Sequence, residues 1–249
     1  MIRVADDLEA LSQSAAALFA AEAQKAGHAR GRFAVALSGG FTPRRTLALL
    51  ARPPFRDQVP WDRVHVFWGD ERCVSLADPR SNAGWALKIL LSQVPIPAAQ
   101  VRPMACAQDP EAGARAYENL LREFFGDGPP RLDLVFLGLG GNGHIASLFP
   151  GHTVLKEKER WVVPVSGPGL DLHRVTLTPV LFNRARLVAF LVAGRDKAWV
   201  LREVLAGPRD PRRLPAQLIH PENGEVLWLV DREAAALLPE GLPGLERSF

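Results

Sequence analysis

One histidine of this sequence stands in a glycine-rich stretch, and its chemistry is the clearest functional signal in the chain. Residues 138–143 read Gly-Leu-Gly-Gly-Asn-Gly, and His144 follows directly. Glycine loses more conformational freedom on folding than any other residue, so this density indicates that the backbone approaches something closely. An imidazole has an unperturbed pKa of about 6.5, which suits proton transfer at neutral pH. We therefore expect His144 to act as a general base, although a lone histidine is more often structural.

The same stretch also matches a dinucleotide-binding pattern. Residues 138–143 have the spacing G-x-G-x-x-G, which in such folds follows a strand and opens a long helix. Here Pro150 arrives soon after His144 and leaves no room for that helix. The run from residue 154 also lacks a second strand that ends in an acidic ribose contact. We therefore reject NAD binding.

A second glycine pair precedes signals for the start of a helix. Residues 38–43 read Ser-Gly-Gly-Phe-Thr-Pro. Thr42 is a good N-cap and Pro43 suits the first helical position, so we expect a helix to begin here. The free N–H groups and the dipole of a helix N-terminus bind anions such as phosphate. Ordinary strand-to-helix turns favour the same residue types, and the Gly-Lys-Ser/Thr ending of a Walker A loop is missing.

Three charges in a row, at residues 70–72, come directly after an apolar run. We expect them to lie in a loop. There Asp70 or Glu71 could take or orient a proton, and the planar guanidinium of Arg72 could hold a phosphate or a carboxylate. A solvated cluster of ion pairs is the alternative. Arg174 and Lys197 could each add positive charge to such a pocket, although single charges of this kind usually lie on the surface.

Helical and extended patterns alternate along the chain and would position these residues. The predicted strands span 32–37, 64–68, 132–137, 186–192 and 225–230, and the predicted helices span 6–26, 42–50, 81–91, 110–125 and 195–205. Strands separated by helices favour right-handed βαβ units. We therefore predict an α/β fold with an open, mostly parallel, Rossmann-like doubly wound sheet flanked by helices. In such sheets, ligands bind beyond the carboxyl ends of the strands.

No part of the sequence has the composition of an interdomain linker. Pro and Gly cluster at 52–60, 126–131, 164–169 and 207–215, and these stretches are short enough to be loops. The chain has 249 residues, which is enough for one large α/β domain with a substantial core. We therefore predict a single domain over residues 1–249.

Charge and hydropathy narrow the classes of partner. The net charge is +3 and the isoelectric point is about 9.2, which favours an anionic partner. The sequence has no dense Lys/Arg block with interleaved aromatic residues, so we do not expect nucleic-acid binding. No apolar run reaches the roughly 18 residues of a membrane span, and the first residues lack the basic-then-apolar order of a signal peptide. We therefore expect a cytoplasmic monomer that binds neither nucleic acid nor membrane.

The cysteines and the other histidines show no pattern of a metal site. Cys73 and Cys106 are too few for a disulfide framework or a cysteine zinc site, so we expect each to be an ordinary small buried residue. The histidines other than His144 lack the spacing of zinc ligands. The sequence contains no Gly-x-Ser-x-Gly elbow, so a serine hydrolase of that type is not supported. We expect no metal and no cofactor.

Together these motifs resemble the 6-phosphogluconolactonase family. The matches occur in family order over residues 38–198, and the Gly-His-x-Ala-Ser-Leu-Phe-Pro-Gly stretch is the most specific. The matching residues are Ser38-Gly39-Gly40, Thr42-Pro43, Trp68, Asp70-Glu71-Arg72, Ser81-Asn82, Gly143-His144, Ala146-Ser147-Leu148-Phe149-Pro150-Gly151, Arg174, Thr176 and Lys197-Ala198. The resemblance implies a lactonase-like α/β fold. It also implies hydrolysis of 6-phosphoglucono-δ-lactone to 6-phosphogluconate, in the oxidative pentose phosphate pathway, without a metal.

The resemblance also implies roles for individual residues. The general base proposed for the family falls on His144, and Arg72 would contact the substrate. The phosphate would be held by Ser38, Gly39, Gly40, Thr42, Arg174 and Lys197. Asn142 stands where the family commonly has Asp, so it can orient His144 but cannot stabilise an imidazolium as a carboxylate can. Phe41 replaces a residue that is often small or polar.

Two alternatives fit part of the sequence. A glucosamine-6-phosphate deaminase is expected to continue after Gly-His-Ile-Ala with an acidic Asn-Glu-Pro stretch, whereas residues 147–150 read Ser-Leu-Phe-Pro. A non-catalytic sugar-phosphate sensor, like the effector domains of some bacterial repressors, should carry an N-terminal DNA-binding module. About thirty residues precede the first predicted strand, and they hold one helical pattern. The lactonase is the better supported of the three.

Overall fold

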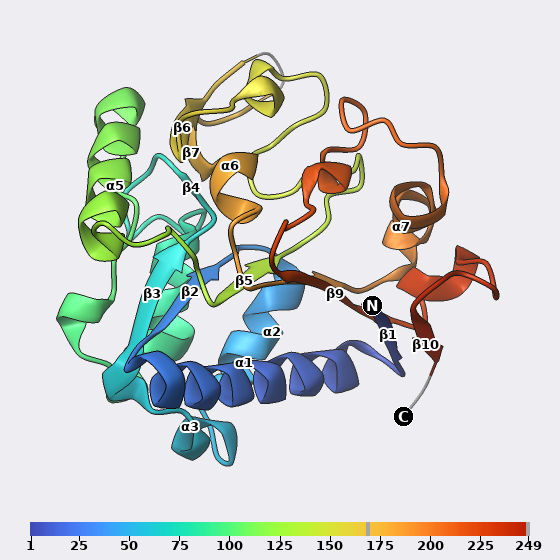
Figure 1. Ribbon diagram of the computed structural model, residues 1–249, viewed down its shortest axis with the longest axis horizontal. Coiled ribbons are helices and arrows are strands. Elements are labelled where there is room, and N and C mark those ends of the chain that lie inside the picture. The colour runs from blue at the N-terminus through green and yellow to red at the C-terminus, as the bar shows by residue number, and fades with distance from the viewer. Residues whose placement is uncertain (168–169, 248–249) are drawn as a thin grey trace.

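A seven-stranded sheet forms the centre of the protein (Figure 1). The computed structural model describes residues 1–167 and 170–247, so the ends of the predicted 164–169 loop and of the predicted 1–249 domain lie outside the described residues. The strand order is β10-β1-β9-β8-β5-β2-β3, and every neighbouring pair is parallel. These strands are β1 (Ile2–Ala5), β2 (Phe33–Leu37), β3 (Val64–Trp68), β5 (Leu134–Leu137), β8 (Leu187–Val192), β9 (Glu225–Asp231) and β10 (Leu245–Arg247). The predicted fold class, a mostly parallel sheet flanked by helices, is confirmed.

Strands β2 and β8 are apolar along their whole length because both faces of the sheet are covered there. Every residue of β2 and of β8 is buried, a pattern typical of parallel strands between layers of helices. Phe190 of β8 stacks on Trp228 of β9, with ring centroids 3.7 Å apart. Full burial of a large apolar side chain contributes about 1.5–3 kcal/mol, so these strands supply much of the stability of the core.

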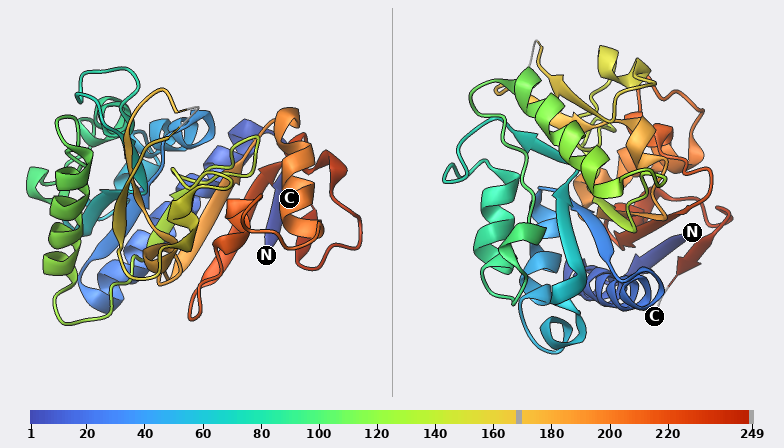
Figure 2. Two further views of the ribbon diagram at one scale, coloured as in Figure 1. Left: turned by 90° about the horizontal axis from the view of Figure 1, so that it is seen from above. Right: turned by 60° about the vertical axis from the view of Figure 1, so that its left-hand side comes forward.

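Helices pack on both faces of the sheet and at both of its ends. Figure 1 shows α1 (Leu8–Arg30) beside α2 (Phe41–Leu50) below the sheet, and α6 (Pro179–Phe182) above it. Figure 2 shows α5 (Pro110–Phe125, green) and α7 (Ala198–Ala206, orange) at opposite ends of the molecule. The remaining helices are α3 (Phe55–Gln58) and α4 (Asn82–Ala86), with short 3-10 or π segments η1 (Trp61–Arg63), η2 (Leu87–Leu91), η3 (Ala98–Gln100), η4 (Thr153–Lys156), η5 (Arg195–Lys197), η6 (Pro215–Leu218) and η7 (Ala234–Leu237).

The ends of the two longest helices follow from their capping residues. The side chain of Asp7 accepts a hydrogen bond from the backbone of Ala10 at the start of α1, and Gly31 ends this helix with φ of 71°. At the start of α5, the side chain of Asp109 accepts two backbone N–H groups, and proline stands in the first turn. Local residue types therefore fix where α1 and α5 begin.

A smaller antiparallel sheet, ordered β4-β7-β6, lies beside β3 and packs against α5. Its strands are β4 (Asp70–Arg72), β6 (Val162–Val165) and β7 (Arg174–Leu177). We predicted a loop at residues 70–72, and this prediction is wrong. Each residue of β4 pairs with one of β7, so a run of charges becomes a strand through ladder bonds to a partner distant in sequence.

All five predicted strands and all five predicted helical segments are present, with ends shifted by a few residues. The segment predicted as one helix at 81–91 is α4 followed by the π segment η2, and the one at 195–205 is η5 followed by α7. No helix among residues 1–167 and 170–247 is long and apolar enough to cross a membrane.

We predicted that the two cysteines are ordinary small buried residues, and this prediction is wrong. They form a disulfide with each other. Cys73 follows β4 and Cys106 precedes α5, and the two Cα atoms are 4.8 Å apart although the residues are 33 positions apart in sequence. The fold brings them together because β4 and α5 both pack against β7. Sequence spacing alone carries no information about such a contact.

Candidate active site

A hollow of about 150 Å³ lies at the carboxyl ends of β2 and β5 and beside β4. We call it the active-site hollow. Seven of the predicted site residues line it: Ser38, Gly39, Gly40, Asp70, Arg72, His144 and Arg174. The other lining residues are Asn82, Gly138, Leu139, Gly140, Ile145 and Ala146. Parallel strands end at one edge of their sheet, which explains why loops distant in sequence converge here. The functional roles of these residues stay predictions.

Asn142 holds the ring of His144 in one tautomer. Oδ1 of Asn142 lies 2.6 Å from Nδ1 of His144 and 3.2 Å from the backbone nitrogen of the same residue. A backbone N–H can only donate, so the atom of Asn142 that faces both nitrogens is its carbonyl oxygen. Nδ1 therefore carries a proton and donates it, which leaves Nε2 bare in the neutral ring. A Cβ at Gly140 would lie 2.0 Å from Nδ1, so the ring packs closely only against glycine.

Burial holds the pKa of His144 below its ordinary value of 6.5, because a desolvated imidazole favours its neutral form. The carboxylate of Asp70 acts in the opposite direction, and the positive charges of Arg174, Lys197 and Arg72 lower this pKa further. The imidazole is therefore mostly neutral at pH 7. A neutral imidazole with a bare Nε2 is the form that can accept a proton from water.

The turn after β2 brings the backbone to the hollow and opens α2. Gly40 is the N-cap of this helix with φ of 103°, a conformation that favours glycine, and the helix begins at Phe41. The predicted N-cap role of Thr42 is therefore wrong, because the glycine turn lets the helix begin earlier and places Thr42 in its first turn. Thr42 is not among the lining residues of the hollow. A Cβ at Gly39 would lie 1.8 Å from Oδ1 of Asn82, so close packing also requires glycine there.

Two of the predicted phosphate ligands already have partners within the protein. The hydroxyl of Ser38 donates to the carbonyl of Phe136 at 2.8 Å and ties the end of β2 to β5. Nζ of Lys197 lies 3.0 Å from a carboxylate oxygen of Asp196. Lys197 is not a lining residue, but its charge acts on the pKa of His144. Contact of Lys197 with a ligand requires this surface ion pair to open.

Two arginines lie side by side on neighbouring strands of the smaller sheet. Arg72 of β4 and Arg174 of β7 are directly opposed, and both line the hollow. Like charges at such positions are destabilising. Nε of each is buried and has no hydrogen-bond partner within the described residues. Arg72 donates to the carbonyl of Arg80 at 2.7 Å, and Arg174 forms an ion pair with the exposed Asp171 at 3.5 Å. The arrangement suits an anion between the two guanidinium groups.

Asp70 is buried beside these arginines but has only uncharged hydrogen-bond partners. It is 5% exposed, and its Oδ2 accepts the hydroxyl of Ser147 at 2.7 Å. Its Oδ1 accepts Nδ2 of Asn82 at 3.3 Å. Among the residues with described side chains, no cation lies within ion-pair distance of Asp70. Its negative charge therefore remains available to the hollow.

Asn82 and Ser147, for which no role was predicted, and Glu71 support the site. Asn82 and Ser147 hold Asp70, and both belong to the family motifs, so the resemblance could have identified them. Glu71 accepts the backbone N–H groups of Arg72, Asn82 and Ala83 and the hydroxyl of Ser81. Burial raises the pKa of Glu71, and these bonds oppose that shift. Glu71 thereby joins β4 to the start of α4.

The geometry supports base-assisted hydrolysis of an anionic substrate. A bare imidazole nitrogen, a carboxylate and two guanidinium groups meet in a hollow that backbone N–H groups also approach. Among residues 1–167 and 170–247, no three His, Cys, Asp or Glu side chains are grouped to hold a metal ion.

Comparisons with known proteins place this site in a family. Residues 6–228 match the family model described as glucosamine-6-phosphate isomerases/6-phosphogluconolactonase. A 6-phosphogluconolactonase of Synechocystis sp. is 45% identical over 209 residues, which cover 82% of this chain and 84% of the relative. The crystal structure of a devB protein has a TM-score of 0.88 and 32% identity, and covers 96% of this chain and 100% of that chain. The structure of 6-phosphogluconolactonase from Trypanosoma brucei has a TM-score of 0.83 and 30% identity, with coverage of 96% and 98%.

Proposed function

The chain belongs to the glucosamine-6-phosphate isomerase/6-phosphogluconolactonase family, and from this premise we propose that it hydrolyses 6-phosphogluconolactone to 6-phosphogluconate. Water attacks the lactone carbonyl, and the ring ester bond breaks. The relatives named for this activity support the assignment. The Ser-Leu-Phe-Pro stretch at residues 147–150 favours it over the deaminase alternative. The reaction belongs to the oxidative pentose phosphate pathway.

One observation carries the proposal. Arg72 and Arg174 are paired across β4 and β7 without a carboxylate between them, and they share the active-site hollow with His144. An anion bound between the two cations would offset their repulsion and accept their unsatisfied N–H groups. A base beside that anion could then take a proton from an attacking water. A phosphorylated lactone supplies both the anion and an electrophilic carbonyl.

The proton transfers follow from the tautomer of His144. Nδ1 donates to Asn142, so Nε2 takes a proton from the attacking water as the new C–O bond forms. The imidazolium then gives this proton to the ring oxygen as it leaves. Asn142 is a positioning residue in this scheme, since it fixes the ring without carrying charge. Asp70 stabilises the transient imidazolium, in line with its upward effect on the pKa of His144.

The cations and the glycine turn bind the phosphate and stabilise the charge that develops during the reaction. We assign the phosphate to the backbone of Ser38, Gly39 and Gly40 at the start of α2, together with Arg174 and, when its ion pair opens, Lys197. Arg72 contacts the bound lactone, and Arg72 or the backbone N–H groups of the turn stabilise the oxyanion of the tetrahedral intermediate. Binding energy from the remote phosphate positions the lactone carbonyl beside Nε2 of His144.

We also propose that the protein works as a cytoplasmic monomer with no metal or cofactor. A phosphorylated sugar is a metabolite of the cell interior, which supports that compartment. The most exposed large apolar side chains come from separate elements, which supports a monomer: Met1, Phe41, Leu76, Trp199 and Leu237. Light scattering of the purified protein tests the oligomeric state.

A direct assay tests the function. Freshly prepared 6-phosphogluconolactone is added to the protein in a pH-stat, and acid release is compared with spontaneous hydrolysis. We expect rapid release from the phosphorylated lactone and a much higher KM for unphosphorylated gluconolactone. Ammonia release from glucosamine 6-phosphate, without acid release from the lactone, would instead indicate the deaminase.

A further inference from the structure

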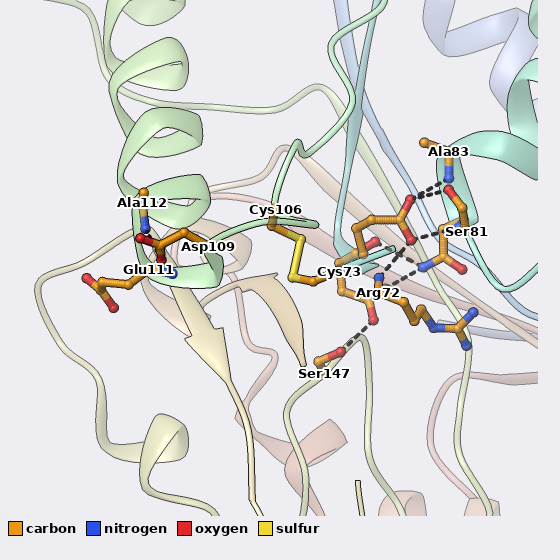
Figure 3. The surroundings of a disulfide bond; sticks show 12 residues. Arg72, Cys73, Ser81, Ala83, Cys106, Asp109, Glu111, Ala112 and Ser147 are labelled. Carbon is orange, nitrogen blue, oxygen red and sulfur yellow. Dashed lines mark hydrogen bonds between the residues drawn. A yellow bond between two sulfur atoms is a disulfide. The ribbon is translucent and has the colours of Figure 1, made fainter. Parts of the chain in front are cut away.

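The disulfide of Cys73 and Cys106 lies next to the active site (Figure 3). Cys73 directly follows Arg72, the last residue of β4, and its backbone N–H donates to the carbonyl of His173 at 2.9 Å. Figure 3 shows Arg72 beside Cys73, with Cys106 on the side of α5. The bond therefore attaches the residue after a substrate-facing arginine to another part of the fold.

The anchor on the other side of the bond is rigid. Cys106 is 3% exposed and packs against the first turns of α5, where a Cβ at Gly113 would lie 2.7 Å from Cβ of Cys106. That helix packs against β6 and β7. A covalent link from Cys106 to Cys73 therefore transmits the position of α5 to the end of β4.

The strand that carries Arg72 is otherwise weakly held at this end. Strand β4 has only three residues and, among the described strands, pairs with β7 alone, so it is an edge strand. Its middle is fixed by the hydrogen bonds of Glu71, but beyond Arg72 the chain enters the exposed residues 75–77. Ladder bonds at the end of a short edge strand open easily. The disulfide adds a covalent restraint at the Arg72 end of β4, beside the hydrogen bonds from the Cys73 N–H to the carbonyl of His173 and from Nη1 of Arg72 to the carbonyl of Arg80.

We propose that the bond between Cys73 and Cys106 is a redox-sensitive brace that positions Arg72, and that a dithiol reductant opens it and weakens substrate binding. A thiolate of the dithiol attacks the sulfur of Cys73, forms a mixed disulfide and releases Cys106 as a thiolate. The second thiol of the reagent then displaces Cys73. One dithiol becomes a disulfide, and two electrons and two protons pass to the protein.

Accessibility and compartment both fit this role. Cys73 is half-buried rather than enclosed, and the bond borders a hollow of about 500 Å³ lined in part by Cys106, Met104 and Leu76. Disulfides in a reducing cytoplasm are usually transient and serve catalysis or redox sensing. If the protein is cytoplasmic, as we propose, a permanent structural bridge is unexpected, whereas a reversible one is not.

Thiol counting and kinetics test the brace, and the kinetic part rests on the proposed function. The sequence contains only two cysteines, so denatured protein should show no free thiol after oxidation and two after treatment with dithiothreitol. We expect reduction to raise KM for the lactone about threefold to tenfold, with a smaller change in kcat, since a displaced Arg72 misplaces the substrate. Re-oxidation should restore KM. The C73S/C106S double variant should resemble the reduced enzyme and ignore dithiothreitol.

Two readouts stand apart from catalysis, so they separate failure of the brace from failure of the proposed function. Reduction should speed hydrogen exchange of the amide of Cys73. It should also lower Tm by roughly 5–10 °C, because the bond closes a long loop in the unfolded chain. Two thiols in the oxidised protein, or unchanged exchange and unchanged KM after reduction, would overturn the proposal.

Discussion

A buried aspartate lies at each end of the parallel strands, Asp133 before the start of β5 and Asp70 after the carboxyl end of β3, and the two carboxylates have opposite surroundings. At the amino end, Asp133 is 4% exposed and lies 2.7 Å from Nη2 of Arg30 and 3.3 Å from Nε of Arg186. At the carboxyl end, Asp70 is 5% exposed and, within the part of the chain that the structure describes, its carboxylate accepts hydrogen bonds only from Ser147 and Asn82. The two carboxylates are thus equally buried. Asp133 is paired with two arginines, whereas Asp70 has no ionic partner among the described side chains.

This difference separates structural charges from functional ones. Asp133 also accepts the backbone N–H of Ala34 at 2.8 Å, so its ion pairs join the starts of β5, β2 and β8. At the carboxyl end, Asp70, Arg72 and Arg174 are held in one hollow without pairing with one another. Unpaired buried charges reduce stability, and proteins accept such conflicts mainly at functional sites.

The strongest test of the comparison removes the base at the carboxyl end. His144→Ala should lower kcat about a hundredfold or more, the usual contribution of a general base, while KM changes little because the phosphate contacts remain. His28→Ala, an exposed histidine near the end of α1, is the matched control and should leave kcat unchanged. Steady-state rates with the lactone check both variants. Undiminished turnover of the His144 variant would falsify the proposed mechanism.

A pair of isosteric changes should then give reciprocal results at the two ends. Asp133→Asn leaves two guanidinium groups without a counter-charge, so we expect a loss of about 2–4 kcal/mol of stability and unchanged kinetics at 25 °C. The carboxylate of Asp70 has only uncharged partners among the described side chains. Asp70→Asn should therefore lower the free energy of unfolding by only about 1 kcal/mol, while kcat falls. Urea unfolding and lactone kinetics on both proteins decide the matter. Similar stability losses at both ends would contradict the comparison.

The arginines allow the same contrast with a smaller expected effect. Arg174→Met removes a charge-assisted contact to the substrate, so kcat/KM should fall about tenfold or more. Its Tm should change little, because the loss of repulsion with Arg72 offsets the loss of the ion pair with the exposed Asp171. Arg30→Met should do the reverse, with a lower Tm and unchanged kcat/KM. A destabilised Arg174 variant with normal KM would mean that Arg174 is structural.

The sequence predicted the large sheet better than the small one, for a physical reason. Strands β2 and β8 are continuous apolar runs because they are buried on both faces, and this pattern is local. Strand β4 consists of three charged residues, and only its pairing with β7 makes it a strand. The short strands β1 and β10 were missed for the same reason, since their extended conformation depends on neighbours distant in sequence.

The site was predictable in its main features and not in its supports. Once His144, the glycine turn at 38–40 and Arg72 were placed after strands, a parallel sheet had to bring them to one edge. The hydrogen bond between Ser147 and Asp70 and the bond between the two cysteines join residues that no local pattern relates. Such contacts depend on the packing of the smaller sheet, which the sequence did not reveal.

The smallest effect concerns the partner of the base. Asn142→Asp places a negative charge beside Nδ1 of His144, which favours the imidazolium and raises the pKa of His144. The neutral ring is the active form, so activity is lost as pH falls through this pKa. Since burial keeps the pKa of the native ring below 6.5, the native enzyme should retain more than half of its maximal kcat/KM at pH 6.5. The Asp variant should lose activity at a higher pH.

The pH profile of kcat/KM separates this electrostatic role from a purely structural one. Asn142→Ala removes the acceptor for Nδ1–H without adding charge, so kcat should fall at every pH while the acidic limb stays near its native position. In Asn142→Asp, a carboxylate oxygen still accepts the hydrogen bond from Nδ1–H of His144. The maximal kcat/KM at high pH should therefore approach the native value, and only the acidic limb of the profile should move. If both variants lower the plateau equally and shift nothing, Asn142 supports the loop rather than the protonation state of His144. That outcome would leave the pKa of His144 to burial and to the cations of the hollow, which again places the control of catalysis at the unpaired end of the sheet.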